Sequence, residues 1–214
     1  RMWAMDPTPG VRLTIINPDA AAPYTGMLPG LIAGHYTQDQ ILIDLVRLAR
    51  FAQARFILDR VTGIDRDQRQ LILQNRAPIS YDLLSLDIGI ASDLPQVEGF
   101  AAHGNAAKPL GDYEQKWAAF VARDLDQPNL VLIGAGVGGV ELALASAHRL
   151  RAKFAKITLV QRSDTALAGV GAVARAMLLD ALRAAGITLI TGAEPVQIMA
   201  DRVVLQDGRE LASD

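Results

Sequence analysis

The sequence predicts an α/β fold made of two similar three-layer domains that follow one another along the chain. Three observations support this prediction: an internal repeat, short apolar strands that alternate with amphipathic helices, and a glycine-rich turn between a strand and a helix. The chain has 214 residues, of which 50% are hydrophobic. This length is sufficient for one large or two small domains.

The internal repeat is visible in two pairs of segments. Residues 12–17 (RLTIIN) match residues 156–161 (KITLVQ), and residues 71–75 (LILQN) match residues 203–207 (VVLQD). In each copy an apolar strand is followed by a loop, an amphipathic helix, a second strand and a hairpin. The agreement in element order indicates two domains of the same plan.

Each copy contains a helix whose apolar residues recur at helical spacing. The first helix is predicted to begin at Thr37, with Gln40 at the spacing of a capping box. The second is predicted to end at Gly186, because glycine is common just after a helix. Asp207-Gly208 predicts a hairpin turn. The expected apolar faces are Ile41, Leu45, Leu48, Ala52 and Phe56 in the first copy and Val173, Met177, Ala181 and Ala184 in the second.

The two copies differ at their ends. A glycine-rich turn precedes the strand at residues 157–160, and its counterpart in the first copy would fall before residue 1. Asp82 leads into an apolar strand predicted at residues 83–89, whereas Asp214 is the last residue. We therefore expect an internal piece of a longer duplicated protein. We predict two domains, both incomplete. The first is residues 1–108, which lacks the first strand and the glycine-rich turn, and the second is residues 109–214. The boundary is expected in the stretch from Pro95 to Gly111.

The glycine-rich turn lies in residues 129–144 (NLVLIGAGVGGVELAL), between an apolar strand and a helical pattern. The spacing Gly134-x-Gly136-x-x-Gly139 in this context is the fingerprint of a dinucleotide-binding turn. Gly134 permits the tight turn, Gly136 lets a pyrophosphate approach the backbone, and Gly139 allows the helix to pack on the strand. Free N–H groups at the helix start would then face the phosphates. The pattern predicts Rossmann-like domains; a close-packed corner without a ligand is the alternative.

The residues after the second strand bear on the choice of dinucleotide. An acid at this place would accept a hydrogen bond from the ribose 2′-hydroxyl, and the chain has Gln161-Arg162 instead. Gln161 can still bond a 2′-hydroxyl, whereas Arg162 can meet a 2′-phosphate. Both NADH and NADPH stay open, with NADH favoured. A polar strand end followed by a solvated surface charge is the other interpretation.

Composition excludes several classes of function. The 21 Lys and Arg residues balance 23 Asp and Glu residues, and only 5% of residues are aromatic, so nucleic-acid binding has no support. The absence of cysteine excludes a disulfide framework, a Cys-ligated metal and thiol catalysis in this chain. The longest apolar stretch, residues 130–140, is shorter than the roughly 20 residues that cross a bilayer. Because no signal-peptide pattern follows Arg1, we expect a cytoplasmic protein without a transmembrane segment.

The remaining side chains suggest no further chemistry. No nucleophile elbow is present, so a hydrolase has no support. We expect core or domain-linker packing, rather than a ring stacked on a cofactor, for Trp117 with Tyr113, Phe120 and Val121. We predict no metal site, because the three histidines are scattered and no carboxylate spacing beside them supports one: His35, His103 and His148, the last expected on a helix surface.

Several motifs together match one known family. They are the duplicated layout, the run from Gly134 to Glu141 (GAGVGGVE), the run at residues 81–89 (YDLLSLDIG) and the Asp207-Gly208 hairpin. This combination resembles the pyridine nucleotide-disulfide oxidoreductase superfamily of FAD- and NAD(P)H-binding flavoproteins. The run at residues 24–36 (YTGMLPGLIAGHY) is similar to its NADH-dehydrogenase-like branch, including the flavoprotein fused ahead of selenide, water dikinase.

The resemblance implies an FAD domain split by an inserted NAD(P)H domain, with hydride passing from the nicotinamide to the flavin. It places Asn17 and Pro18 at the FAD adenosine ribose and Val61 beside the adenine. Asp87-Ile88-Gly89 stands where the family has Ala-Thr-Gly near the FAD. The implied NAD(P)H-binding residues are Gly134, Gly136, Val137, Gly138, Gly139, Glu141, which points toward the nicotinamide end, Gln161 and Arg162.

The implied activity is that of an FAD-dependent NAD(P)H dehydrogenase that passes electrons to a quinone or another small acceptor. Two departures, Asn17 in place of an acid and Asp87 in place of a small residue, lower the expected affinity for FAD. They leave a second hypothesis open, a degenerate relative that binds nucleotide as a sensor or scaffold without turnover. We expect negligible dehydrogenase activity from this chain alone. A homo-oligomer, peripheral contact with the inner face of the membrane and a fused or associated selenide, water dikinase also stay open.

Overall fold

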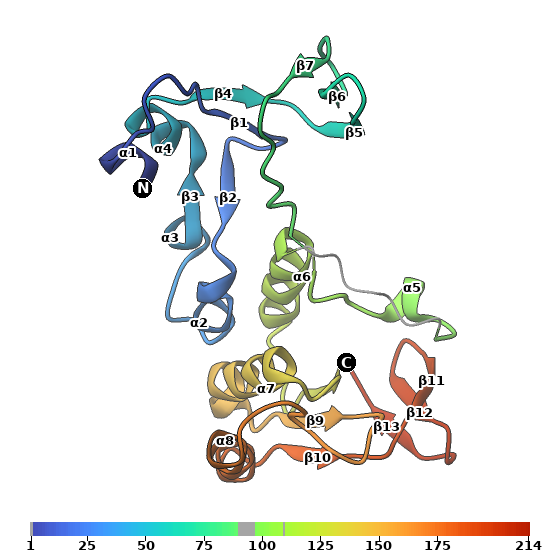
Figure 1. Cartoon of the computed structure of the whole chain (residues 1–214). Helices are drawn as coiled ribbons and strands as arrows, with labels where there is room; N and C mark the ends of the chain where they lie inside the picture. The colour runs from blue at the N-terminus through green and yellow to red at the C-terminus, as the bar shows by residue number, and fades with distance from the viewer. Residues whose placement is uncertain (1, 90–96, 109) are drawn as a thin grey trace. The chain divides into compact units, whose positions relative to one another are not determined.

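The computed structural model describes residues 2–89, 97–108 and 110–214 (Figure 1). The chain forms two compact units: unit 1 comprises Arg1–Tyr24 and Gln38–Gly89, and unit 2 comprises Thr25–Thr37 and Ile90–Asp214. Both contain parallel strands together with helices, so the predicted α/β class is confirmed. The predicted boundary between residues 108 and 109 stays a prediction, and Pro95 and Pro109 lie outside the described residues.

Unit 1 contains three small sheets. One is a parallel pair, β1 with β4, one is an antiparallel pair, β2 with β3, and one is an antiparallel sheet in the order β5-β6-β7. The strands are β1 (Thr14–Asn17), β2 (Ala21–Pro23), β3 (Leu42–Asp44), β4 (Arg55–Leu58), β5 (Val61–Asp65), β6 (Gln70–Leu73) and β7 (Ile79–Ser80). The helices are α1 (Met2–Met5), α3 (Gln38–Ile41) and α4 (Leu45–Phe51).

Unit 2 is built on a parallel sheet in the order β10-β9-β8 and an antiparallel sheet in the order β11-β12-β13. The strands are β8 (Asn129–Ile133), β9 (Lys156–Val160), β10 (Thr188–Ile190), β11 (Pro195–Ile198), β12 (Arg202–Leu205) and β13 (Glu210–Ala212). The helices are η1 (Thr25–Met27), α2 (Leu28–Ile32), α5 (Phe100–His103), α6 (Leu110–Ala122), α7 (Val137–Leu150), η2 (Arg151–Lys153) and α8 (Ala172–Ala184).

The topology confirms the internal repeat. The matched strands β1 and β9 each pair in parallel with the next core strand of their copy, β4 and β10. In both copies a three-stranded antiparallel sheet follows, β5-β6-β7 in the first and β11-β12-β13 in the second. Gly208, at φ 86, turns the predicted hairpin between β12 and β13. Gly186, at φ 70, follows α8 as predicted.

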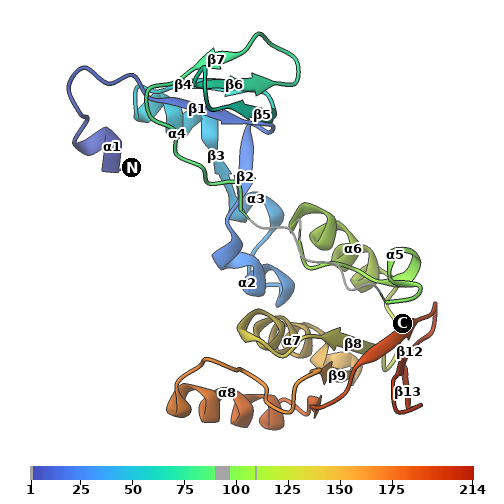
Figure 2. The same cartoon turned by 45° about the vertical axis from the view of Figure 1, so that its right-hand side comes forward.

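The parallel sheet of unit 2 carries a core on each face, because successive side chains of a strand point to opposite sides. Ile157 and Leu159 of β9 pack with residues of α7 and α8 in one buried cluster. Figure 2 shows these two helices beside the parallel sheet. Val160, on the other face, packs with residues of β11 and β12. The strand pattern of apolar residues on both faces is that of a parallel sheet covered on both sides. The sheet is therefore a rigid platform for the turn that leaves β8.

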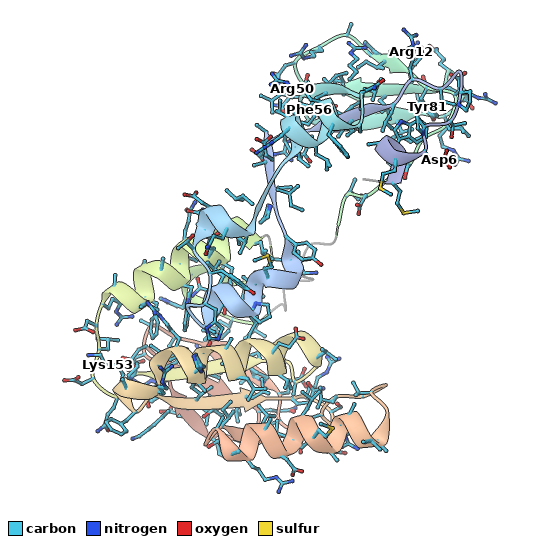
Figure 3. All side chains as sticks on the ribbon, turned by 90° about the vertical axis from the view of Figure 1, so that its left-hand side faces the viewer. Asp6, Arg12, Arg50, Phe56, Tyr81 and Lys153 are labelled. Carbon is cyan, nitrogen blue, oxygen red and sulfur yellow. The ribbon has the colours of Figure 1, made fainter. Side chains whose placement is uncertain are left out.

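The long helix predicted from Thr37 to Phe56 is wrong. The segment forms α3, then the strand β3, then α4, and Phe56 lies in β4 (Figure 3). Leu42–Asp44 pair with Ala21–Pro23, and Asp44 caps α4 by accepting a hydrogen bond from the Arg47 N–H at 2.8 Å. Backbone bonds to a distant strand thus interrupt the helical pattern, which spacing alone does not reveal.

Two other predictions of local structure are also wrong. Residues 83–89 form no strand, and Leu83 is 92% exposed, because a strand requires a hydrogen-bonded neighbour and the described residues supply none. The helix α8 forms as predicted but buries another face. Val173 and Met177 are exposed, whereas Leu182 is 1% exposed and packs with Leu178 and Leu179 against the sheet.

Candidate functional site: the glycine-rich turn between β8 and α7

The glycine-rich turn has the predicted strand, turn and helix order. β8 ends at Ile133, Gly134 to Gly136 form the turn, and α7 begins at Val137. Gly134 has φ 103, a conformation that side chains rarely adopt. Its N–H donates to Val160 C=O at 2.7 Å, which fixes the turn to the end of β9.

Gly139 lets the helix approach the strand end closely. A Cβ atom built on Gly139 would lie 1.8 Å from the carbonyl oxygen of Gly134. Because that oxygen belongs to the backbone, a side chain here requires α7 to move away from the turn. The close approach brings Val140 and Ala143, both 0% exposed, against Leu159 of β9. Glycine at this position thus couples the shape of the turn to the core.

The start of α7 offers hydrogen-bond donors to a ligand. The first bond of the helix runs from the Val140 N–H to Gly136 C=O at 3.0 Å, so the N–H groups of Val137 and Gly138 precede the helical ladder. Cβ atoms built on Gly136 and Gly138 would meet nothing within 4 Å, so the space beside the turn is open. The positive end of the helix dipole faces the same way. The turn therefore fits the pyrophosphate of a dinucleotide.

Gln161 holds the turn in place. Its Oε1 accepts a hydrogen bond from the Ala135 N–H at 2.7 Å, and its Nε2 donates to Ser163 Oγ at 2.7 Å. The Ala135 C=O in turn accepts from the Leu167 N–H at 2.8 Å. Sequence reasoning assigned Gln161 to the ribose and missed this link. The available signal was a polar side chain at the end of the strand next to β8.

The neighbouring charges are exposed. Arg162 has a 79% exposed side chain and a 3.8 Å contact with the carboxylate of Glu194. Glu141 lies on the exposed side of α7, one turn beyond Val137. Arg162 and Glu194 thus form an exposed contact of opposite charges just after β9. The role of Arg162 beside a ribose stays a prediction.

A cavity of about 1170 Å³ in unit 2 includes the start of α7 in its lining. Gly138, Gly139 and Glu141 contribute one part of the wall, and Tyr113 and Trp117 of α6 contribute another. Both aromatic side chains also pack with the cluster around Leu28 and Leu142, as predicted for core packing. Burial raises the pKa of Tyr113 to about 12.

In unit 1, a backbone hydrogen bond joins the end of β1 to the segment that leads into β5. Asn17 ends β1, and its C=O accepts from the Asp59 N–H at 3.1 Å, two residues before Val61 opens β5. The Asn17 Nδ2 donates to Asp19 C=O at 2.8 Å. Pro18 follows on the surface. Their place at an FAD adenosine stays a prediction.

Asp87 and Gly89 lie in an exposed segment without regular structure, and Gly89 has φ 68. Their role near FAD stays a prediction. Asp59, which sequence reasoning missed, is only 4% exposed. Its carboxylate accepts hydrogen bonds from the Arg60 N–H at 2.8 Å and from Asn75 Nδ2 at 3.0 Å. Asp59 is therefore a structural link at the start of β5.

Within residues 2–89, 97–108 and 110–214, no group of three or more His, Asp or Glu side chains is placed to hold a metal ion. In the same ranges, no helix has the length and apolar character needed to span a bilayer.

Curated relatives match most of the chain. Two NADH dehydrogenase-like proteins of Mycobacterium tuberculosis, from strains CDC 1551 / Oshkosh and ATCC 25618 / H37Rv, are each 28% identical over 166 residues. The match covers 72% of this chain and 41% of each relative. The chain thus spans about two fifths of the length of these proteins.

Solved structures share the fold. The ferredoxin reductase for the CYP199A2 system from Rhodopseudomonas palustris has a TM-score of 0.83 and 22% identity, covering 100% of this chain and 53% of that one. NDH2 from Plasmodium falciparum in complex with NADH has a TM-score of 0.79 and 13% identity, covering 94% and 48%. Putidaredoxin reductase in its covalent complex with putidaredoxin has a TM-score of 0.75 and 23% identity, covering 95% and 50%.

The family model of the pyridine nucleotide-disulphide oxidoreductases matches residues 4–214. This family consists of FAD- and NAD(P)H-dependent flavoproteins, so the expected class of cofactors is confirmed at the level of the family. The match covers both the glycine-rich turn before α7 and the repeated strand topology described above. The chain belongs to the pyridine nucleotide-disulphide oxidoreductase family.

Proposed function

We propose that the chain is the NAD(P)H-binding part and a portion of the FAD-binding part of an FAD-dependent NAD(P)H dehydrogenase. The observation that carries the proposal is the turn between β8 and α7, where Gly139 lies against the Gly134 carbonyl and the first N–H groups of the helix face open space. When bound, NAD(P)H supplies a hydride that FAD accepts, and the electrons leave to a quinone or another small acceptor.

The chain's own residues hold and orient the dinucleotide. The N–H groups of Val137 and Gly138 donate to its phosphates, and Gly136 leaves room for them beside the backbone. Gln161 keeps the turn in this shape through its bond to the Ala135 N–H. The position of the pyrophosphate is thus set before the ligand arrives, which lowers the entropy lost on binding.

Charge beside the ribose decides between NADH and NADPH in this proposal. Arg162 attracts a 2′-phosphate, and Glu194 repels it and accepts from a 2′-hydroxyl. The Gln161 amide is neutral and is already bonded to the turn, so it does not change this balance of charge. We favour NADH, since a single exposed arginine already paired with a carboxylate gives a weak phosphate site.

In unit 1, the Oδ1 of Asn17 accepts from the FAD adenosine ribose and Val61 lies beside the adenine. Asp87 and Gly89 complete this side in the proposal. The proposal also places the protein in the NADH-dehydrogenase-like branch. It further includes a homo-oligomer, peripheral membrane contact, and an association with the enzyme selenide, water dikinase. The family match and the two M. tuberculosis relatives support the branch.

The first test is a visible absorption spectrum of the purified full-length protein that contains this chain, followed by anaerobic titration with NADH and then NADPH. We expect flavin absorption, retained or restored by added FAD, that bleaches more readily with NADH. Nucleotide that binds without bleaching bound flavin would support the alternative, a sensor or scaffold without turnover. Absence of flavin after reconstitution, together with no nucleotide binding, would refute both.

A pair of alanine variants tests the turn itself. Gly136 and Gly171 are both N-cap glycines, with φ −76 and −56, and a Cβ on either would meet nothing within 4 Å. Both variants should therefore fold as the parent does. Gly136→Ala should weaken NAD(P)H binding about tenfold or more, because its methyl group occupies the path of the pyrophosphate, whereas Gly171→Ala should not. Equal affinities for the two variants, measured by fluorescence titration, would refute the assigned site.

A further inference from the structure

A second group of positively charged or titratable side chains lies at the opposite end of α7. His148 and Arg149 are in its last turn, Arg151 begins η2, and His35 follows α2. These four side chains line a cavity of about 430 Å³ together with Ala33, Gly34 and Ala152. We call them the basic cluster. No acidic residue is among the residues that line this cavity.

The packing of α2 against α7 fixes the position of the basic cluster. Leu28 and Ile32 of α2 form a buried group with Leu142 and Ala145 of α7. All four are at most 9% exposed. The loop that carries His35 leaves α2 directly, and the His35 N–H donates to Gly30 C=O at 2.8 Å. The two elements therefore hold their basic side chains at a defined separation.

The two histidine rings are close, with centroids 4.8 Å apart. A guanidinium can only donate hydrogen bonds, so the 3.0 Å contact between Arg151 and the Nε2 of His148 makes this nitrogen the acceptor. The ring proton of neutral His148 is then on Nδ1, which is left as a donor. Desolvation, Arg151 and His35 lower the pKa of His148. A bound anion would offset the positive charge that Arg151 places beside this ring.

Arg149 has no ion pair with any described residue. It lies against Gly34, where a Cβ atom would be 2.7 Å from its Nη1 and the backbone has φ +82. By contrast, Lys153 in η2 (Figure 3) pairs with Asp124 at 2.9 Å and Asp126 at 3.8 Å. Among the described residues, the charge of Arg149 therefore has no carboxylate partner, whereas the charge of nearby Lys153 is compensated by two carboxylates.

Stabilisation of the helix end accounts for only part of this arrangement. Basic residues are favourable near the carbonyl end of a helix, and the Arg151 Nη1 does donate to His148 C=O at 2.9 Å. That role does not require Arg149 beside Gly34 or a second histidine from another element. α7 has 14 residues and is about 21 Å long, so the cluster is also separate from the glycine-rich turn.

We propose that the basic cluster of His35, His148, Arg149 and Arg151 is a binding site for a phosphate-class anion, distinct from the dinucleotide site. Arg149 and the Nδ1–H of His148 donate to the anion, and His35 adds a donor from the facing loop. The source of the anion is either a free phosphate or the phosphate of a lipid headgroup.

The test uses the three histidines of the sequence as probes. In protein labelled with ¹³C-histidine, the ring signals of His35, His148 and His103 are followed during titration with inorganic phosphate, against sodium chloride of equal ionic strength. We expect saturable shifts for His35 and His148 and none for His103, which lies in α5. Equal shifts for all three histidines would overturn the proposal. The absence of shifts beyond those in chloride would also overturn it if vesicles give no response.

Variants and vesicles complete the test. Arg149→Gln should weaken phosphate binding about fivefold or more without lowering Tm. Arg183→Gln in α8, which removes the same charge from a residue paired with Asp180, should leave it unchanged. A response only to phosphatidylcholine vesicles containing phosphatidylglycerol, lost in Arg149→Gln, would support the site with a lipid as its source. Equal loss in both arginine variants would overturn it, because general charge would then explain binding.

Discussion

Replacing Gly139 by alanine tests how closely α7 must approach the turn. The new Cβ would lie 1.8 Å from the Gly134 carbonyl oxygen, whereas ordinary van der Waals contact begins at 3.4 Å. The helix and the turn must therefore separate by about 1.6 Å, the difference between these distances. This movement pulls Val140 and Ala143 away from Leu159, all of which are 0% exposed.

The magnitude follows from two opposing effects. Overpacking of a tight contact costs about 1–3 kcal/mol, and alanine gains up to about 1 kcal/mol over glycine in a helix. We expect a net loss of about 1–2 kcal/mol. For a protein of this size the loss corresponds to a Tm lower by about 2–8 °C.

Gly138→Ala is the matched control, because it adds the same methyl group one residue earlier in the helix, where nothing lies within 4 Å. It should leave Tm unchanged or raise it. Thermal unfolding without nucleotide, followed by circular dichroism, measures both variants. A Tm for Gly139→Ala equal to that of the parent, or an equal loss for Gly138→Ala, would refute the reasoning.

Three further predictions concern side chains away from the glycines. Gln161→Ala leaves the Ala135 N–H without its 2.7 Å acceptor, so the affinities for NADH and NADPH should fall by similar factors in nucleotide titrations. A loss of affinity confined to NADH would instead indicate that Gln161 contacts the ribose. Tyr113 should ionise near its raised pKa of about 12 in an absorbance titration, so stability falls as pH rises above the unfolded value of 10.0. Tyr113→Phe should reduce this alkaline loss, and an unchanged profile would contradict it. Asp59→Asn keeps an oxygen for the Arg60 N–H and Asn75 Nδ2 but turns an amide donor toward the Asn75 N–H and Arg76, and should cost about 1–3 kcal/mol in denaturant unfolding; a neutral effect would show that the bonds of the second oxygen are dispensable.

The sequence by itself determined the features that depend on local residue type. Gly134, Gly136 and Gly139 between an apolar strand and a helix specify the turn. Gly134 adopts a positive φ that favours glycine, Gly139 makes a close contact that only glycine fits, and Gly136 leaves open space beside the backbone. Gly186 and Gly208 mark a helix end and a hairpin for the same reason as Gly134. The repeat was readable because both copies keep the order of their elements.

Only the tertiary structure decided the features that depend on distant partners. The pairing of β3 with β2 divides the predicted helix, since hydrogen bonds to residues some twenty positions away outweigh helical spacing. The sheet, rather than the periodicity of α8, selected Leu182 instead of Met177 for burial. Gln161 became a support of the turn because β9 lies beside β8. In each case the deciding energy comes from contacts that a linear pattern does not contain.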